Sequence, residues 1–250
     1  MREVEPLRAL GALILRDIGC ALRTPAFVVV AGLGVALCWL IAQWADGPLL
    51  ADERLRRFLL ASATVVPALM GGGSVVLFLL VEEREHGACP TLFRTGISLG
   101  AMVASKVVAA LAFTALTALA CLIAIGAPLG CWAPATLAVT ATSLPFLLVV
   151  TALGVTLRAY AQTGIWSLVL VVLALPSQVA ELDRAVAPLA AALPLEAATA
   201  VMIWLVTGEA PAEGWPAVGA VFAAWLAAGA ALLAAALRRR AREDADEAGE

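Results

Sequence analysis

The sequence predicts an all-α protein, a polytopic membrane helical bundle, and three observations support this fold class. The 250 residues are 63% hydrophobic and 14% charged, whereas soluble domains are about 45–50% apolar and about 25% charged. The mean hydropathy is +0.98. Six apolar segments approach the roughly 20 residues that a helix needs to cross a bilayer. They are residues 26–45, 58–81, 102–125, 135–157, 164–179 and 215–237.

The first 25 residues predict an amphipathic helix that lies in the membrane interface. Apolar residues recur at three- and four-residue spacing over 6–23, and Arg8, Arg16, Asp17 and Arg23 interrupt them. This pattern is typical of interfacial helices. Pro25 ends the helix and forms an elbow before the first span. The alternative is a soluble helix that packs on a partner.

The cations predict a multi-pass protein of the inner (plasma) membrane with both termini in the cytoplasm. With an even number of spans, only four of the 16 cations fall on the side opposite the termini: Arg54, Arg56, Arg57 and Arg184. Cytoplasmic loops carry an excess of Lys and Arg. A five-span topology would place 238–242 outside and break this rule. No basic patch interleaved with aromatics is present, so we expect no nucleic-acid partner.

Proline and glycine interrupt two of the expected spans. The second span contains Pro67 and Gly71-Gly72-Gly73, and the fourth contains Pro145. Proline removes a backbone donor, and small residues let helices approach closely in membranes. Both a flexible point with a gating role and simple close packing fit these residues.

The segment 180–214, between the fifth and sixth spans, is too polar for another clean span. An apolar run from Leu193 to Gly208 within it is short for crossing and predicts a re-entrant or interfacial helix on the outer side. Residues 238–250 pass from basic to acidic and predict a solvated cytoplasmic tail.

The sequence lacks the residues that an intramembrane enzyme needs. Its single histidine, His86, lies outside the spans, and no metal-binding or nucleophile motif is present. The five cysteines form no CxxC pair and are predicted to be packing residues. A phosphate-binding loop for ATP is also missing. We therefore expect no catalytic residue, metal or cofactor, and any energy for transport must come from another subunit.

A charged insert, residues 82–100, follows the second span. Charges in hydrocarbon cost several kcal/mol each, so the chain must reach water here. The insert therefore presents a compact charged element to water.

These features together resemble the permease subunits of type-two ATP-binding-cassette (ABC) exporters. Glu83-Arg84-Glu85 and Gly87 match the acidic loop motif of that family, Thr91-Leu92 matches after a shift, and Lys106 is in place. Ala88-Cys89-Pro90 and Gly96 depart from the motif.

The resemblance implies a six-span permease domain whose short coupling helix seats in a cleft of a separate ATPase. The candidate ATPase-coupling residues that it implies are Glu82, Glu83, Arg84, Glu85, Gly87, Thr91, Leu92 and Arg94. It implies two ATPase copies and a second permease copy, as homodimer or heterodimer. The nearly uncharged spans suggest an amphipathic or lipid-like cargo that leaves the cytoplasm.

Two alternatives stay open. The chain also resembles, in length and loop, a haem-exporter-type permease of cytochrome c maturation, although the long segment after Pro176 fits general exporters better. The other alternative is a non-transporting membrane scaffold or immunity protein. A stoichiometric ATPase partner would separate export from scaffolding.

Overall fold

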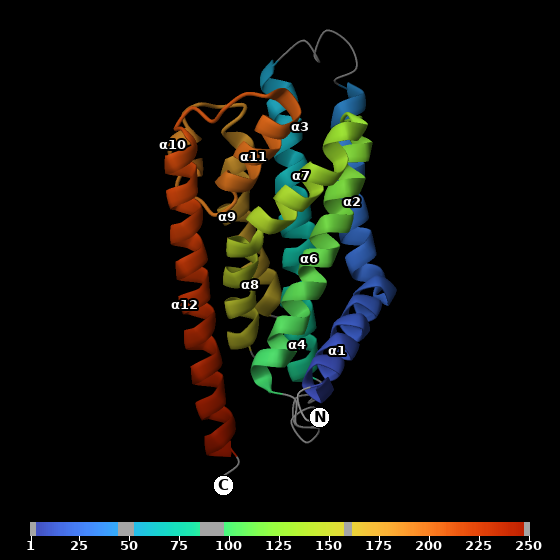
Figure 1. Cartoon of the computed structure of the whole chain (residues 1–250), viewed down its shortest axis with the longest axis vertical. Helices are drawn as coiled ribbons and strands as arrows, with labels where there is room; N and C mark the ends of the chain where they lie inside the picture. Colours follow the sequence, from blue (N-terminus) through green and yellow to red (C-terminus); the bar gives the residue numbers. More distant parts are fainter. Residues whose placement is uncertain (1–3, 45–52, 86–97, 158–161, 248–250) are drawn as a thin grey trace.

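The computed structural model describes residues 4–44, 53–85, 98–157 and 162–247; the side chains of 4–9 and 244–247 are not described. These residues form helices and turns and contain no strand. The all-α prediction is therefore confirmed for the described part of the chain. The helices form an elongated bundle, in which the first turn of α1 and the last turn of α12 lie at the same end (Figure 1). We call this the terminal end and the opposite one the loop end.

The helices follow one another in the order α1 (Val4–Arg23), α2 (Pro25–Trp44), α3 (Glu53–Val66), η2 (Pro67–Gly73), α4 (Ser74–Glu85), α6 (Leu99–Ala124), α7 (Leu129–Thr142), α8 (Leu144–Thr156), α9 (Thr163–Val179), α10 (Ala187–Ala190), α11 (Glu196–Thr207) and α12 (Trp215–Glu247).

Within the described residues, four continuous helical stretches are long and apolar enough to cross a membrane: Pro25–Trp44, Glu53–Glu85, Leu99–Ala124 and Trp215–Glu243. The pair α7 and α8 is a fifth candidate, bent by 43°. With 17 and 12 residues, α9 and α11 are apolar but shorter. These helices make the chain a membrane protein, whereas the predicted count of six spans is not established by their lengths.

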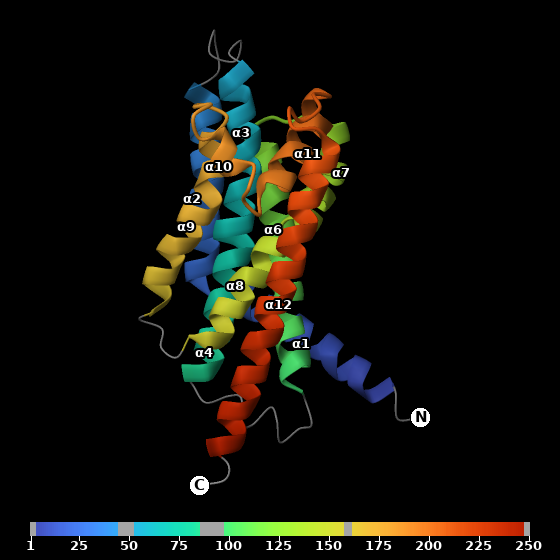
Figure 2. The same ribbon diagram turned by 90° about the vertical axis from the view of Figure 1, so that its left-hand side faces the viewer.

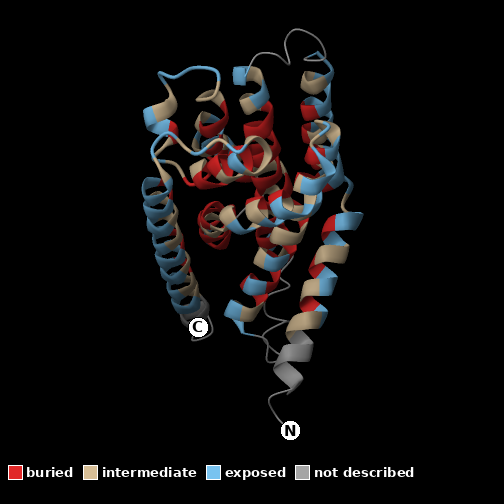
Figure 3. Ribbon diagram, turned by 45° about the horizontal axis from the view of Figure 1, so that its top comes forward, coloured by how far each residue is buried: buried red, intermediate tan, exposed pale blue. Residues whose placement is uncertain are grey.

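The stretch Glu53–Glu85 forms the centre of the bundle. In its most apolar 18-residue window 78% of the residues are buried, against 11% in the corresponding window of α12. Figure 3 shows the same contrast, with buried residues in the interior and exposed ones along the outer face of α12. The outer helices therefore present apolar side chains that lipid or another chain can cover.

The segment of Pro67 and Gly71-Gly72-Gly73 forms a π-helix, η2, within this central stretch. A Cβ atom on Gly71 would lie 2.9 Å from Thr117 Oγ1, and one on Gly72 would overlap Thr114 Oγ1 and lie 2.8 Å from the Ala110 carbonyl oxygen. These contacts show that the glycines permit close packing against α6. A π-helical turn of this kind is a local irregularity within an otherwise α-helical stretch.

The fourth apolar segment is broken at Ser143, between α7 and α8. Pro145 lies in the first turn of α8, where its missing N–H leaves no helical hydrogen bond unmade. The final helix packs against this break, because a Cβ atom on Gly229 would lie 3.1 Å from the Pro145 carbonyl oxygen. Helix α12 therefore packs closely against the α8 side of the break.

Helix α1 diverges from the bundle axis beside α6 (Figure 2). Only Thr24 separates it from Pro25 at the start of α2, as the predicted elbow requires. Leu13 and Ala21 are buried, whereas Leu15 and Leu22 are exposed. An apolar face therefore remains for the membrane interface.

Candidate functional site

Five polar residues from three helices meet at the terminal end of the bundle. We call Arg16 and Asp17 of α1, Glu83 of α4, and Ser105 and Lys106 of α6 the Lys106 cluster. Lys106 is completely buried, and 2% of the Asp17 surface is exposed. Such burial is rare for charged side chains unless they are paired.

The geometry of the Lys106 cluster satisfies both buried charges. Lys106 Nζ lies 2.7 Å from Glu83 Oε2 and 3.4 Å from Asp17 Oδ2. The Ser105 hydroxyl donates to Asp17 Oδ2 over 2.6 Å.

Arg16 completes the Lys106 cluster from its exposed side. Its Nε and Nη2 donate to Asp17 Oδ1 over 3.1 and 2.9 Å, and Nη2 also pairs with Glu83. Two cations and two carboxylates therefore balance, so the cluster is neutral when all four are ionised.

The buried ion pairs of the Lys106 cluster hold α1, α4 and α6 together. Removal of one partner from a buried ion pair costs about 3–5 kcal/mol, because an uncompensated charge remains buried. The Lys106 cluster joins the elbow helix to both helices that flank the charged insert. A movement of one of these three helix ends is thus resisted by the other two.

Arg84 makes a second set of contacts at the terminal end. Its Nη1 donates to the carbonyl oxygen of Leu157 over 2.8 Å and lies 3.4 Å from those of Val155 and Thr156. These carbonyls belong to the end of α8, where the helix leaves them without internal donors. Arg84 Nη2 also lies 3.6 Å from Glu243 of α12. Arg84 therefore connects α4 to α8 and α12.

The structure places the candidate residues of the charged insert in three groups. Glu82 and Glu85 are exposed on the last turn of α4. Glu83 and Arg84 instead face neighbouring helices and contact them. Four of the candidates lie outside the described residues: Gly87, Thr91, Leu92 and Arg94.

Sequence reasoning missed the pairing of Asp17 with Lys106. Asp17 was grouped with the residues that interrupt the apolar pattern of the first helix, and Lys106 was counted only as a cation and a motif position. The available signal was Lys106 itself, the single lysine, within an apolar stretch. An ionisable residue in such a position usually has a specific partner.

The loop end carries a second group of ion pairs. Arg57 of α3 pairs with Glu181 over 2.7 Å and with Glu209 over 2.9 Å, and Arg56 lies 3.2 Å from Glu209. Glu181 follows α9, and Glu209 lies between α11 and α12. The arginines predicted on the outer side are thus partly neutralised, and they connect segments far apart in the sequence.

No group of three or more His, Cys, Asp or Glu side chains that could hold a metal ion occurs among the described residues. Cys38 and Cys121 are free and buried, and each belongs to the apolar core. The chemistry that the described side chains support is thus ion pairing between helices.

Fold and site define the class, a helical membrane protein whose helices are joined by ion pairs at both ends of the bundle. No protein-family model matches the sequence, and a search of curated proteins gives no match.

Proposed function

We propose that the chain is the transmembrane permease subunit of an ATP-driven ABC exporter, powered by a separate ATPase subunit. One observation carries the proposal: the Lys106 cluster joins α1, α4 and α6 at the end of the bundle where the charged insert leaves α4. An element that receives force from a motor subunit needs such a connection to the helices that must move. The insert itself supplies the charged surface for a separable interface.

The contacts suggest a route for this motion. A displacement of the end of α4 acts on α6 through the pair of Glu83 and Lys106, and on α1 through Asp17 and Arg16. The same displacement acts on α8 and α12 through Arg84. Glu83 and Arg84 together thus connect a movement of α4 to α1, α6, α8 and α12. Rigid helices transmit it along their length.

The proposed topology has six spans, with α9 as the fifth and the terminal end in the cytoplasm. The positive-inside distribution of arginines supports this orientation in the plasma membrane. The short helices α10 and α11 then lie on the outer side. The coupling loop or helix of the proposal spans 82–100, of which 86–97 lie outside the described residues.

The exposed helix faces support two further parts of the proposal. α2 and α9 present large apolar side chains outward, including Leu33, Trp39, Ile165, Leu168 and Val172. Such faces suit lipid, an amphipathic or lipid-like cargo and a second permease copy. The absence of a phosphate-binding loop in the sequence means that ATP hydrolysis is assigned to the partner.

Co-purification tests the proposal. The tagged chain is extracted from its native membrane in a mild detergent, and the associated proteins and their ATP turnover are measured. The proposal expects two permease copies with two copies of a subunit that contains a phosphate-binding loop. Recovery of a stable oligomer of this chain alone, with no ATPase at any stoichiometry, would support a scaffold and refute the permease.

A further inference from the structure

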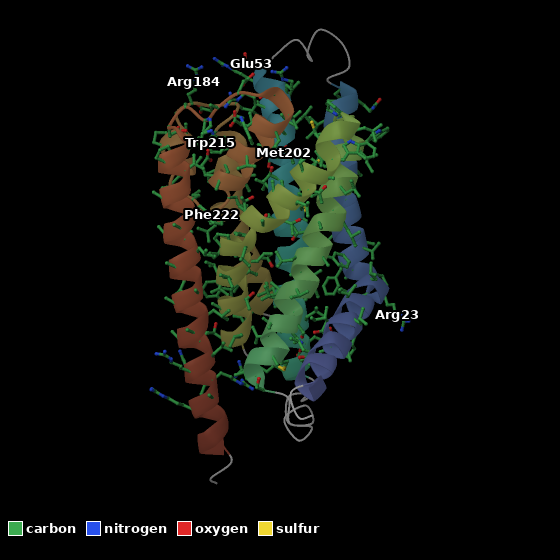
Figure 4. The ribbon with its side chains drawn as sticks, viewed as in Figure 1. Arg23, Glu53, Arg184, Met202, Trp215 and Phe222 are labelled. Atoms are coloured by element: carbon green, nitrogen blue, oxygen red, sulfur yellow. The ribbon has the colours of Figure 1, made fainter. Side chains whose placement is uncertain are left out.

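A cavity of about 670 Å³ lies at the loop end of the bundle. It is bordered by the start of α3, the end of α9, α10, α11 and the connection from α11 to α12. Figure 4 labels Glu53 and Arg184, which line it, at this end of the molecule. The volume falls within the range of about 300–1,000 Å³ that small-molecule sites occupy.

The walls of this loop-end cavity are mostly small and apolar. Ala187, Pro188, Ala191, Ala200 and Ile203 are among the lining residues. Small side chains leave the space open, and their methyl and methylene groups offer a surface for an apolar body. Besides ten alanine, proline and isoleucine residues, eight charged residues line the cavity.

The charges that line the loop-end cavity favour a cation. Five carboxylates and three guanidinium groups line it, so ionisation of all of them leaves a surplus of two negative charges. Arg57 is already engaged by Glu181 and Glu209. The lining residues with charge are Glu53, Glu181, Glu196, Glu209, Glu213, Arg54, Arg57 and Arg184.

Three lining carboxylates, Glu53, Glu196 and Glu213, make no ion pair with the described residues, and of these three Glu196 alone is partly buried. It lies at the first position of α11. Burial, with smaller contributions from Glu181 and Glu213, raises the pKa of Glu196 to about 7, and Arg57 opposes the shift. A bound positive charge would supply the partner that the protein does not.

A bare metal ion does not match the loop-end cavity. The described residues contain no group of three or more His, Cys, Asp or Glu side chains that could hold one, and the volume of about 670 Å³ is far larger than one ion. An organic ion fills this space better, because its apolar part can cover the alanine-rich wall while its charge meets a carboxylate.

We propose that the loop-end cavity binds an organic ammonium ion, with the charged nitrogen at Glu196 and the apolar body against the wall of Ala187, Ala191 and Ala200. The ammonium group can belong to a free amine or to the ethanolamine headgroup of a phospholipid. The site requires only this chain and does not depend on the exporter proposal.

Calorimetry on the full chain in phosphatidylcholine nanodiscs tests the site, with 2-phenylethylamine as the probe and 2-phenylethanol as its neutral control. Wild type should bind the amine and not the alcohol. Glu196→Gln should weaken amine binding at least tenfold, whereas Glu196→Asp should keep it within a few-fold. Asp183→Asn, a matched loss of charge at an exposed position that does not line the cavity, should leave binding unchanged.

The pH and lipid dependence complete the test. Binding should strengthen from pH 6 to pH 8 in wild type, since Glu196 loses its proton over this interval, and not in Glu196→Gln. Competition by phosphatidylethanolamine in the nanodisc would assign the site to a lipid headgroup, and its absence would assign it to a free amine. Equal binding of amine and alcohol, or unchanged binding by a folded Glu196→Gln, would overturn the proposal.

Discussion

Lys106 Nζ lies 2.7 Å from Glu83 Oε2, and this pair links the beginning of α6 to the end of α4. Lys106 is completely buried, and its ammonium group also pairs with Asp17 of α1. The pair is thus the centre of the connection between the elbow helix and the two helices that flank the charged insert.

Replacement of Lys106 by methionine should destabilise the protein strongly. The change leaves Asp17 and Glu83 without their buried cation, so we expect a loss of about 3–5 kcal/mol in the free energy of unfolding. Unfolding in detergent with increasing denaturant measures it. Arg238→Met, at an exposed position of α12, is the matched control and should have little effect.

A combined variant shows whether the loss comes from the unpaired carboxylates. Asp17→Asn and Glu83→Gln added to Lys106→Met remove these charges and should restore part of the stability. A triple variant as unstable as the sum of its single variants would contradict the ion-pair interpretation.

Gly72 should not tolerate a side chain. A Cβ atom there would overlap Thr114 Oγ1 and lie 2.8 Å from the backbone oxygen of Ala110, so Gly72→Ala should cost about 1–3 kcal/mol through overpacking. Gly32→Ala is the control, since nothing lies within 4 Å of its added Cβ. Thermal unfolding compares the two. Equal melting temperatures for both variants would show that the close contact of η2 with α6 is not a constraint.

Arg57→Gln should loosen the loop end without affecting the terminal end. The change removes the ion pairs with Glu181 and Glu209, which lie on either side of α10 and α11. Hydrogen exchange should become faster in residues 180–214 and stay the same in α4 and α6. Faster exchange throughout the bundle, or an unchanged exchange rate in 180–214, would contradict a role of Arg57 that is confined to the loop end.

Glu196 should make stability depend on pH. Its pKa is raised to about 7 from an ordinary value of 4.5, mainly by burial. The folded state therefore holds the proton more tightly than the unfolded state. The resulting stabilisation is complete below pH 4.5 and is lost as the pH rises through 7.

Glu196→Gln isolates this contribution to stability. Melting temperatures measured from pH 4.5 to pH 8 should fall more steeply in wild type than in the variant, which lacks the titrating group. Parallel curves for the two proteins would mean that the pKa of Glu196 is not raised in the folded state.

The apolar helices could be predicted from the sequence because a membrane-length helix requires a continuous run of about 20 apolar residues, which is visible in the sequence alone. The second apolar segment, 58–81, lies wholly within the continuous helical stretch Glu53–Glu85. The end of α11 could also be predicted from Gly208 in the sequence. In the structure Gly208 has φ of 78°, a left-handed conformation that glycine adopts readily and that ends helices. Local chemistry determines such features, so a local pattern reveals them.

The helix break was harder to predict from proline alone. Pro145 stands next to the 43° bend, but Pro134 and Pro176 lie inside α7 and α9. Packing of neighbouring helices decides which proline becomes a bend, and that information is not local.

The Lys106 cluster could not be assembled from sequence for the same reason. Asp17 and Lys106 are 89 residues apart, and hydropathy does not say which face of α1 meets which face of α6. Glu83 and Arg84 looked like part of a solvated insert. They lie inside the last turn of α4, whose helical geometry directs them towards neighbouring helices.

ATP turnover by the purified complex tests the central claim most directly. Glu85 is exposed on the last turn of α4, and Arg94 follows in the insert. Charge reversal by Glu85→Lys and Arg94→Glu should therefore abolish turnover stimulated by the permease, while each variant chain keeps its wild-type melting temperature. Turnover equal to wild type in both variants would contradict the account of an ATPase that acts on this chain through its charged insert.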